Sequence, residues 1–461
     1  MDRLSELPEW ILLHILSFLT MKDVVRTAIL SKRWRHLWTI IQELDFSLDA
    51  FTYQNFVYFV NRTLLSRGTS KIRRLRIRLF LDASSHKDYA GWIMYAAKNN
   101  VEELFLDFDS GGCVWSPPEC VYCNSSLKTL RMHSCRFRPD KQISWNLLTK
   151  LTLRVSVLWD ETIPKIMAGA PKLEFFELYA CFGYDDLNFD SPSLRVLNVH
   201  EAEPDQYELG PVMTISAPNV QSLHLSGVFY RKCVLMNVPS VVHATLNFRP
   251  LTHSDTQKNL KWQQENLMEL VRSLKHVESL TLGTWCVEVL ALREKRRIPS
   301  QISTHKCVTL NIRMKEDHLL GIVNLLKGSP GLQMLIIDMG SSLSLRKASS
   351  DLQMLLSLWE EPIGTEDSSN SNGANYLVSQ AKHVKCLLNH LKTVKITQFV
   401  AQHSVFPFLE FILKNGRVLE NLVIIAKRGV DANSPESLLK VAQRLLSLPR
   451  ASSQAVVTLL N

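Results

Sequence analysis

Apolar residues recur at helical spacing near the start of the chain. The spacing predicts a helix over residues 8–18, which Pro8 can begin because a first-turn residue needs no partner for an N–H. The residues of its apolar stripe are Ile11, Leu12, Ile15, Leu16 and Leu19. A short helical hairpin buries little surface, so we expect a second surface to cover these side chains.

Two more short helices follow. Thr20 precedes Asp23 by three residues. This arrangement resembles a capping box, in which the hydroxyl accepts a backbone N–H and the carboxylate reaches back. The apolar stripe of this second helix consists of Val24, Val25, Ala28 and Ile29. Ser31 is predicted to cap a third helix with Trp34, Leu37 and Trp38.

From about residue 70 the pattern changes to apolar, two residues, apolar, one residue, apolar, and it recurs at intervals of roughly 20 to 30 residues. Each copy predicts a short strand whose alternate side chains face a core that only a stack of copies can bury. The middle residues of the triplets are Leu75, Leu104, Leu130, Leu151, Phe176, Leu197, Leu223, Ala244, Leu280, Leu310, Leu335, Val394 and Leu422.

Two stretches interrupt this repeat. Residues 254–266 are predominantly polar and predict a helix or a loop. Residues 360–375 are acidic and then rich in Ser, Asn and Gly, which predicts disorder. After them we expect a strand, a helix over Phe406 to Asn415, and a strand over Leu422 to Ile425.

The N-terminal residues resemble the F-box as plant proteins write it, most distinctively in the ending "LSKRWRHLW". Thr20 stands where that family usually has proline, but its capping role preserves the helix start. The resemblance implies docking on a Skp-type adaptor and, through it, on a cullin. The residues it implies as adaptor contacts are Leu7, Pro8, Ile11, Ile15, Leu16, Leu19, Val24 and Trp34.

The later repeats, in phrases such as "LRMHSC" and "VQSLHL", resemble the irregular leucine-rich repeats found behind plant F-boxes, and the stretch from "VKCLLNHLKTVKI" resembles their FBD region. The implied fold class is α/β: a three-helix F-box, a leucine-rich-repeat solenoid of the α/β horseshoe type, and a C-terminal FBD region. The expected boundaries are 1–45 for the F-box, 70–350 for the repeats, 355–376 for a disordered loop, 380–430 for the FBD region and 431–461 for a C-terminal cap.

This resemblance implies a substrate adaptor of a Skp–cullin–F-box ubiquitin ligase that catalyses nothing itself and binds a target protein through the repeats. In such repeats the residues between the inward leucines face the concave side of the sheet. The expected target-binding residues are Arg131, His133, Arg154, Glu177, Tyr179, His200 and His224. One alternative is a scaffold that binds the adaptor but has no degradation target.

Charge and composition add few constraints. The 461 residues carry 53 basic and 44 acidic side chains, a net charge of +9, mixed along most of the chain. Basic clusters at "KIRRLRIRLF" and "REKRR" leave nucleic acid as a third alternative, but we expect the first to be a solvated strand face. No stretch approaches a membrane span, so we expect a cytoplasmic or nuclear protein with reduced thiols.

Catalytic and metal-binding chemistry is not expected. Cys120 and Cys123 form a CxxC motif, and the ligand types nearby are Cys113, His133 and Cys135. However, Cys135 and Cys181 each stand where a leucine-rich repeat turns the chain after its strand. No motif groups a cysteine with a histidine base, and no phosphate-binding glycine loop is present. We therefore expect neither a metal nor a cofactor.

Overall fold

The structure is a computed structural model that describes residues 6–68, 70–80, 88–109, 114–203, 209–251, 256–340, 380–400, 405–429 and 435–460. The chain divides into two compact units. The first unit consists of Met1–Ala202, Met213–Val220 and Met236–Pro239, and the second of Glu203–Val212, Gln221–Leu235 and Ser240–Asn461.

The first unit begins with a small helical module. Its elements are α1 (Glu9–Ser17), α2 (Met21–Arg26), η1 (Thr27–Ile29), α3 (Trp34–Leu37) and η2 (Trp38–Ile40). The Thr20 cap is confirmed: its Oγ1 accepts the Asp23 N–H at 3.3 Å and donates its proton to the Asp23 carboxylate at 2.7 Å. α3 starts at Trp34, and the backbone N–H of Arg35 donates to the Ser31 carbonyl at 3.1 Å, so a cap at Ser31 stays a prediction.

Arg67 joins this module to the elements that follow it. These are β1 (Glu43–Ser47), η3 (Leu48–Ala50) and α4 (Tyr53–Ser66), none of which the apolar pattern predicted. The Arg67 guanidinium donates to the carbonyl oxygen of Trp38 at 3.0 Å and to that of Ile41. Burial lowers the pKa of Arg67 to about 10. The end of the module is therefore tied to the C-terminal end of α4.

The sheet of the first unit is parallel, in the order β1, β2, β3, β4, β5, β6, β8. The strand bounds are β2 (Arg74–Phe80), β3 (Glu103–Asp109), β4 (Thr129–His133), β5 (Lys150–Arg154), β6 (Phe175–Tyr179) and β8 (Val196–Glu201). The predicted repeats are confirmed, because the middle residues lie opposite one another and are buried. This row consists of Leu75, Leu104, Leu130, Leu151, Phe176 and Leu197.

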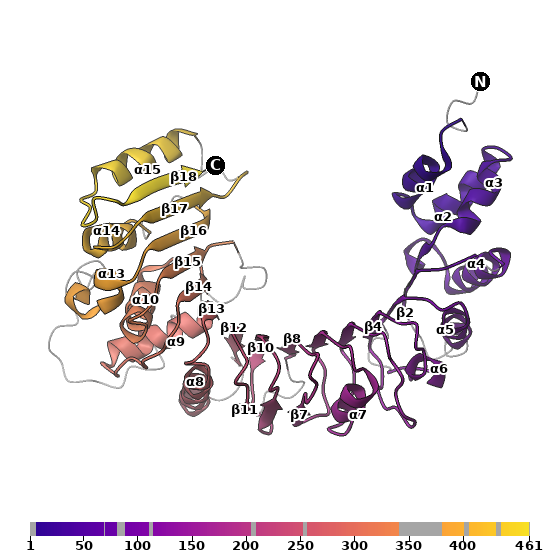
Figure 1. Cartoon of the computed structure of the whole chain (residues 1–461), viewed down its shortest axis with the longest axis horizontal. Coiled ribbons are helices and arrows are strands. Elements are labelled where there is room, and N and C mark those ends of the chain that lie inside the picture. The colour runs from indigo at the N-terminus through magenta and orange to yellow at the C-terminus, as the bar shows by residue number, and fades with distance from the viewer. Residues whose placement is uncertain are drawn as a thin grey trace. The chain divides into compact units, whose positions relative to one another are not determined.

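Helices lie on one side of this sheet, as Figure 1 shows for α5 (Asp88–Lys98) and α6 (Glu119–Tyr122), and both helices carry buried residues. α7 (Thr162–Gly169) follows β5. A separate parallel pair is formed by β7 (Asp186–Asn188) and β9 (Met213–Ser216). The opposite face of the large sheet carries the half-buried residues that alternate with the core.

Three neighbouring strands end in the same unusual conformation. Ser134, Val155 and Ala180 directly follow β4, β5 and β6 and have φ angles of 54°, 49° and 53°. This left-handed region is unfavourable for residues with a side chain and most unfavourable for β-branched ones such as valine. The repeat therefore fixes the turn even where no glycine is available.

The second unit continues the same design, with parallel strands in the order β10, β12, β13, β14, β15, β16, β17, β18. The bounds are β10 (Ser222–Phe229), β12 (His243–Pro250), β13 (Ser279–Gly283), β14 (Cys307–Asn311), β15 (Met334–Asp338), β16 (Thr393–Phe399), β17 (Asn421–Ala426) and β18 (Val456–Leu460). β11 (Cys233–Asn237) is divided between the two units. β16 pairs with β15 and β17, so the C-terminal strands extend the repeat sheet.

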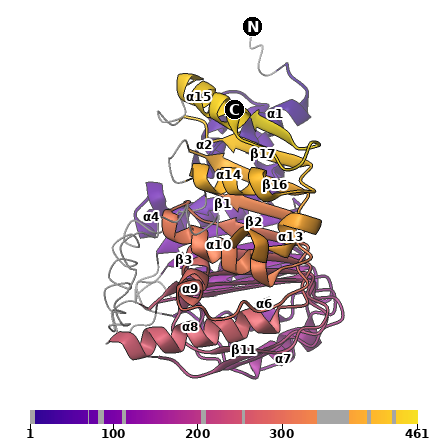
Figure 2. The same ribbon diagram turned by 90° about the vertical axis from the view of Figure 1, so that its left-hand side faces the viewer.

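The helices of the second unit lie along one side of these strands, as the view in Figure 2 shows for α10, α14 and α15. Their bounds are α8 (Thr256–Ser273), α9 (Thr284–Lys295), α10 (Glu316–Gly328), η4 (Ala381–His383), α13 (Lys385–Asn389), α14 (Phe406–Asn415) and α15 (Pro435–Ser447). α8 confirms the helical interpretation of residues 254–266, and α14 has the predicted bounds. The expected disordered loop at 355–376 lies outside the described residues.

One repeat register was wrong by two residues. Val308, not Leu310, lies opposite Leu280 and is the middle residue of its repeat. The first apolar position of that repeat is filled by His305, which is 2% exposed. Its Nδ1 lies 2.8 Å from the Val277 carbonyl oxygen, a hydrogen bond that allows a polar ring to occupy a core position.

Candidate interaction surfaces

The helical module has a core of its own. Leu12, Leu16, Val24, Trp34 and Leu37 are all at most 5% exposed. Leu16, Val24 and Trp34 are three of the predicted adaptor contacts, and all three belong to this core. Their contact role stays a prediction. Spacing identifies an apolar stripe but does not say whether the module or a partner covers it.

Other apolar residues of the module face solvent. Phe18 is 75% exposed, Ile29 is 88% exposed and Leu30 is 59% exposed. Trp10 is also exposed. Of the predicted contacts, five remain at least partly accessible, namely Leu7, Pro8, Ile11, Ile15 and Leu19. The expected contacts did not include Phe18, Ile29 or Leu30. Phe18 and Leu30 lie off the predicted stripes, whereas Ile29 was placed on the stripe of the second helix but lies in η1 and is exposed.

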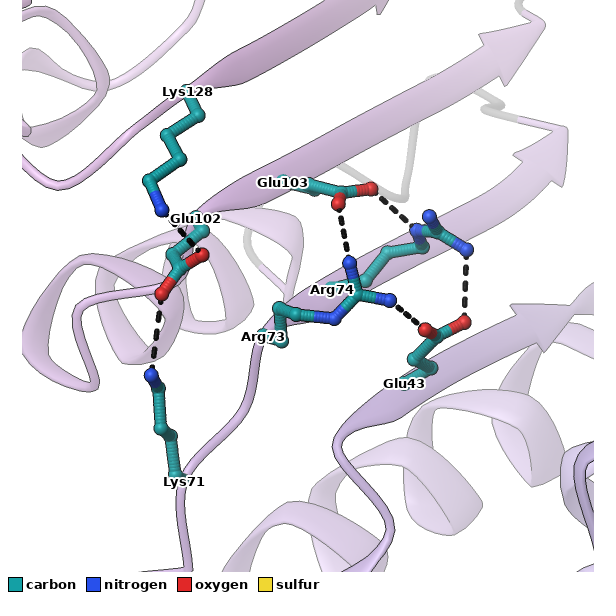
Figure 3. Close-up of polar contacts among 7 residues, drawn as sticks. All are labelled: Glu43, Lys71, Arg73, Arg74, Glu102, Glu103 and Lys128. Atoms are coloured by element: carbon teal, nitrogen blue, oxygen red, sulfur yellow. Dashed lines mark hydrogen bonds and ion pairs between the residues drawn. The ribbon is translucent and has the colours of Figure 1, made fainter. Parts of the chain in front are cut away.

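Charged side chains at the start of the sheet are matched with one another. Figure 3 shows Glu43 of β1 and Glu103 of β3 on either side of Arg73 and Arg74, with both carboxylates contacting both guanidinium groups. The Glu103 contacts measure 2.8 Å to Arg73 and 2.6 Å to Arg74. The basic stretch "KIRRLRIRLF" therefore folds between two acidic strands.

The same matching continues along β2. Arg76 contacts Asp107 at 3.0 Å, and Arg78 contacts Asp45 at 3.1 Å. In Figure 3, Glu102 lies between Lys71 and Lys128, whose hydrogen bonds lower the pKa of the Glu102 carboxyl. A patch for nucleic acid needs uncompensated positive charge. The principal basic cluster of the sequence does not supply it.

Six of the seven predicted target-binding residues come together on the exposed face of strands β4 to β8. His133, Arg154, Tyr179 and His200 lie directly opposite one another on successive strands. Arg131 and Glu177 lie in the adjacent row, two residues earlier on their strands. His224 belongs to β10 in the second unit, where burial lowers its pKa.

Aromatic rings organise this face. The Arg154 guanidinium lies 4.2 Å from the centroid of the Tyr179 ring. The Tyr179 and His200 rings stack with centroids 4.3 Å apart and planes within 3°. Earlier on the same two strands, Lys150 Nζ lies 4.5 Å from the centroid of Phe175. The sequence analysis missed this last pair, because the pairing register is needed to see that Lys150 and Phe175 lie opposite each other.

Two of the predicted residues are held by neighbours. Arg131 contacts Asp107 at 2.9 Å. His133 Nδ1 lies 3.0 Å from both the Phe108 carbonyl oxygen and the Ser134 hydroxyl. These two side chains therefore form the border between the ion-paired strands β1 to β3 and the cation–aromatic pairs of β5 and β6.

The cysteines considered as zinc ligands differ in their exposure to solvent. Cys123 is exposed and Cys120 is half-buried, whereas burial raises the pKa of the Cys135 thiol to about 12. Cys113 lies outside the described residues. Across the part of the chain that the structure describes, no three His, Cys, Asp or Glu residues are grouped as a metal site.

Among the described helices, none is both long and apolar enough to cross a membrane.

Comparison with protein families gives two matches. The F-box domain matches residues 4–44, which is the helical module and the start of β1. A leucine-rich-repeat domain described as At1g61320/AtMIF1, LRR domain, matches residues 64–446. This second match spans the strands from β2 to β17 and most of α15.

Similar proteins of Arabidopsis thaliana extend over most of the chain. The putative F-box protein At1g49610 is 32% identical, with 73% of this chain and 84% of that protein covered. The F-box/LRR-repeat protein At3g03360 is 29% identical over 99% of this chain and 90% of its own length. The F-box/FBD/LRR-repeat protein At4g26340 is 27% identical over 99% of both chains. Together with the module and the repeat sheet, these matches show that the chain belongs to the F-box/leucine-rich-repeat family.

Proposed function

We propose that this chain is the substrate-recognition subunit of a Skp–cullin–F-box ubiquitin ligase. The observation that carries the proposal is a helical module with a complete core that nevertheless exposes large apolar side chains, in the segment that matches an F-box. Exposed apolar groups of this size mark interaction sites. The partner is a Skp-type adaptor, which connects the chain to a cullin.

The adaptor surface is assigned to the accessible apolar residues of the module. They are Leu7, Pro8, Trp10, Ile11, Ile15, Phe18, Leu19, Ile29 and Leu30. Leu16, Val24 and Trp34 support this surface from inside. Covering one exposed large apolar side chain contributes about 1.5–3 kcal/mol, so a few such contacts account for a stable complex.

The target protein is assigned to the open face of the repeat sheet. In this arrangement the chain is not an enzyme: it raises the concentration of the target beside a ubiquitin-loaded enzyme that the cullin holds, and the rate gain comes from proximity. The reaction takes place in the cytoplasm, the nucleus or both.

The test is adaptor binding by purified full-length variants. Ile29→Asp places a charge in the proposed interface, where an unpaired buried charge costs several kcal/mol, and should weaken adaptor binding a hundredfold or more. Leu65→Asp is the matched control, since Leu65 is 81% exposed on α4 outside the module. A folded Ile29→Asp protein that binds the adaptor as tightly as the wild type would overturn the assignment.

A reconstituted ubiquitination reaction distinguishes the ligase hypothesis from the hypothesis of an adaptor-bound scaffold. The ligase requires ubiquitin transfer to a protein captured by the sheet face, and transfer should fall in proportion to adaptor binding in Ile29→Asp. Adaptor binding without transfer to any captured protein would favour the scaffold.

A further inference from the structure

Two cations on β5 lie against two aromatic rings on β6. Lys150 is opposite Phe175 and Arg154 is opposite Tyr179 in the pairing register. The distances from the charged group to the ring centroid are 4.5 Å and 4.2 Å. We call Lys150, Arg154, Phe175, Glu177, Tyr179 and His200 the cation–aromatic face.

These cations differ from the other basic residues of the first unit's sheet. Arg74, Arg76, Arg78 and Arg131 each contact a carboxylate. Within the described ranges of the chain, neither Lys150 nor Arg154 has an ion-pair partner. Their positive charges are positioned by aromatic rings and are not neutralised by a neighbouring strand.

The rings hold the cations in place without consuming their hydrogen-bond donors. A guanidinium that stacks on an aromatic face keeps its N–H groups directed outward from its edge, where they match a carboxylate. Tyr179 is itself stacked on His200. An ordered cation loses less side-chain entropy when an anion binds, so this face is prepared for an acidic ligand.

The spacing defines the ligand further. Lys150 and Arg154 are four residues apart on one strand, which corresponds to about 13 Å. Glu177 lies between them along the strand direction, opposite Thr152 on the neighbouring strand. An extended peptide has the same rise per residue, and its residues i, i+2 and i+4 point to one side. Such a peptide matches this face when residues i and i+4 are acidic and residue i+2 is basic.

We propose that the cation–aromatic face binds an extended acidic segment of the target protein with the pattern acidic, any, basic, any, acidic. This inference rests on the proposed role of the sheet as the target-binding surface. It adds to that role the chemical class of the ligand and the spacing of its charges.

Nucleic acid fits the same face less well. The Tyr179 ring has Arg154 on the side of β5 and His200 on the side of β8, so neither of its faces is free for a base. Base stacking on aromatic side chains is a main source of single-strand affinity. Glu177 also interrupts the positive charge that a phosphate backbone would follow.

The test measures fluorescence anisotropy of a labelled serine-based peptide with two glutamates four residues apart and a lysine midway. The full-length chain should bind it, and Arg154→Met or Lys150→Met should each weaken binding about tenfold, as expected for one lost charge-assisted contact. Tyr179→Ala should also weaken binding, because it removes the ring that orients Arg154. Lys172→Met is the control, since Lys172 is an exposed lysine outside this face.

A peptide with the charges exchanged should bind at least tenfold more weakly, and single-stranded DNA should not compete. Equal binding of both peptides, wild-type binding by Arg154→Met and Lys150→Met, or stronger binding of the DNA would each overturn the inference.

Adaptor binding is measured on the same preparations. Adaptor binding without peptide binding defeats this inference alone. Peptide binding without adaptor binding defeats the ligase assignment alone.

Discussion

The helical module and the open face of strands β4 to β8 present opposite kinds of surface in one compact unit. The module exposes large apolar side chains such as Phe18 and Ile29. The sheet face exposes cations, rings and carboxylates such as Arg154, Tyr179 and Glu177. Apolar contact is nondirectional, which suits one constant partner, whereas placed charges discriminate between partners. In the proposed function, the constant interaction with the adaptor and the selective interaction with the target therefore belong to separate structures.

The largest expected effect is a loss of stability of the helical module, caused by a charge placed in its core. Leu16→Asp places a carboxylate at a position that is 1% exposed, and it should lower the free energy of unfolding of the module by at least about 3 kcal/mol. Phe18→Asp, two residues away and 75% exposed, should unfold like the wild type. Limited proteolysis within residues 6–40 measures both. Equal resistance of Leu16→Asp and wild type would contradict the burial of Leu16.

Salt should separate the two surfaces. Raising the salt concentration from about 50 mM to about 500 mM should weaken binding of the acidic peptide roughly tenfold, because exposed charges are screened within a few ångströms at high ionic strength. Adaptor binding should change less than about twofold, because apolar contact is not screened. Titrations of both ligands on one preparation test this. Parallel salt curves would mean that the two surfaces do not differ in kind.

Asp107→Asn should reduce the difference in charge pairing between strands β1 to β3 and the cation–aromatic face. Asp107 contacts both Arg76 and Arg131, so its neutralisation leaves Arg131, on the strand next to β5, without its carboxylate partner. Affinity for the acidic peptide should rise about threefold, the effect of a nearby exposed charge of roughly 0.6 kcal/mol. Adaptor affinity should stay constant. An unchanged peptide affinity would show that the border formed by Arg131 does not limit the site.

Acidification should weaken the repeat region of the second unit. Burial lowers the pKa of His305 below its ordinary value of 6.5, the hydrogen bond to Val277 opposes this shift and His276 adds to it. Below about pH 6.5 the unfolded chain therefore binds a proton that folded His305 still excludes. The free energy of unfolding decreases as the pH is lowered, until the pH has passed below the pKa of folded His305. His224 acts in the same direction.

Thermal unfolding at pH 7.5 and pH 5.5 measures this loss. His305→Asn keeps a donor for the Val277 carbonyl but no titratable ring, so its melting temperature should depend less on pH than that of the wild type. Equal pH dependence of both proteins would remove His305 as a cause.

A further small effect concerns the strand end beside Arg154. Val155 has a φ of 49°, which Asn tolerates better than a β-branched residue does. Val155→Asn should raise the free energy of unfolding by roughly 0.5–1 kcal/mol without changing adaptor binding. The control is Val212→Asn, since Val212 is exposed and has no positive φ. Chemical denaturation compares the two, and an equal change in both variants would rule out relief of backbone strain.

Periodicity predicted most strands because the middle position of each repeat is buried and holds an apolar residue such as Leu130. It failed at β14, where His305 fills an apolar position through one hydrogen bond. On the module it placed Leu16 on the apolar stripe and Phe18 off it, but it did not predict that Leu16 is buried within the chain itself while Phe18 is exposed. The pairing of Lys150 with Phe175 depends on register between strands, which residue spacing within either strand does not contain.

The hydrogen bonds of Arg67 have a mechanical consequence. Because its guanidinium holds the carbonyls of Trp38 and Ile41, the chain passes from the module into β1 without a free hinge at that point. In the proposed ligase, the first unit then holds the adaptor and the target at a fixed distance from each other. Which lysines of the target receive ubiquitin would be set by their distance from the bound segment. Arg67→Met would make this connection flexible and increase the number of target lysines that receive ubiquitin.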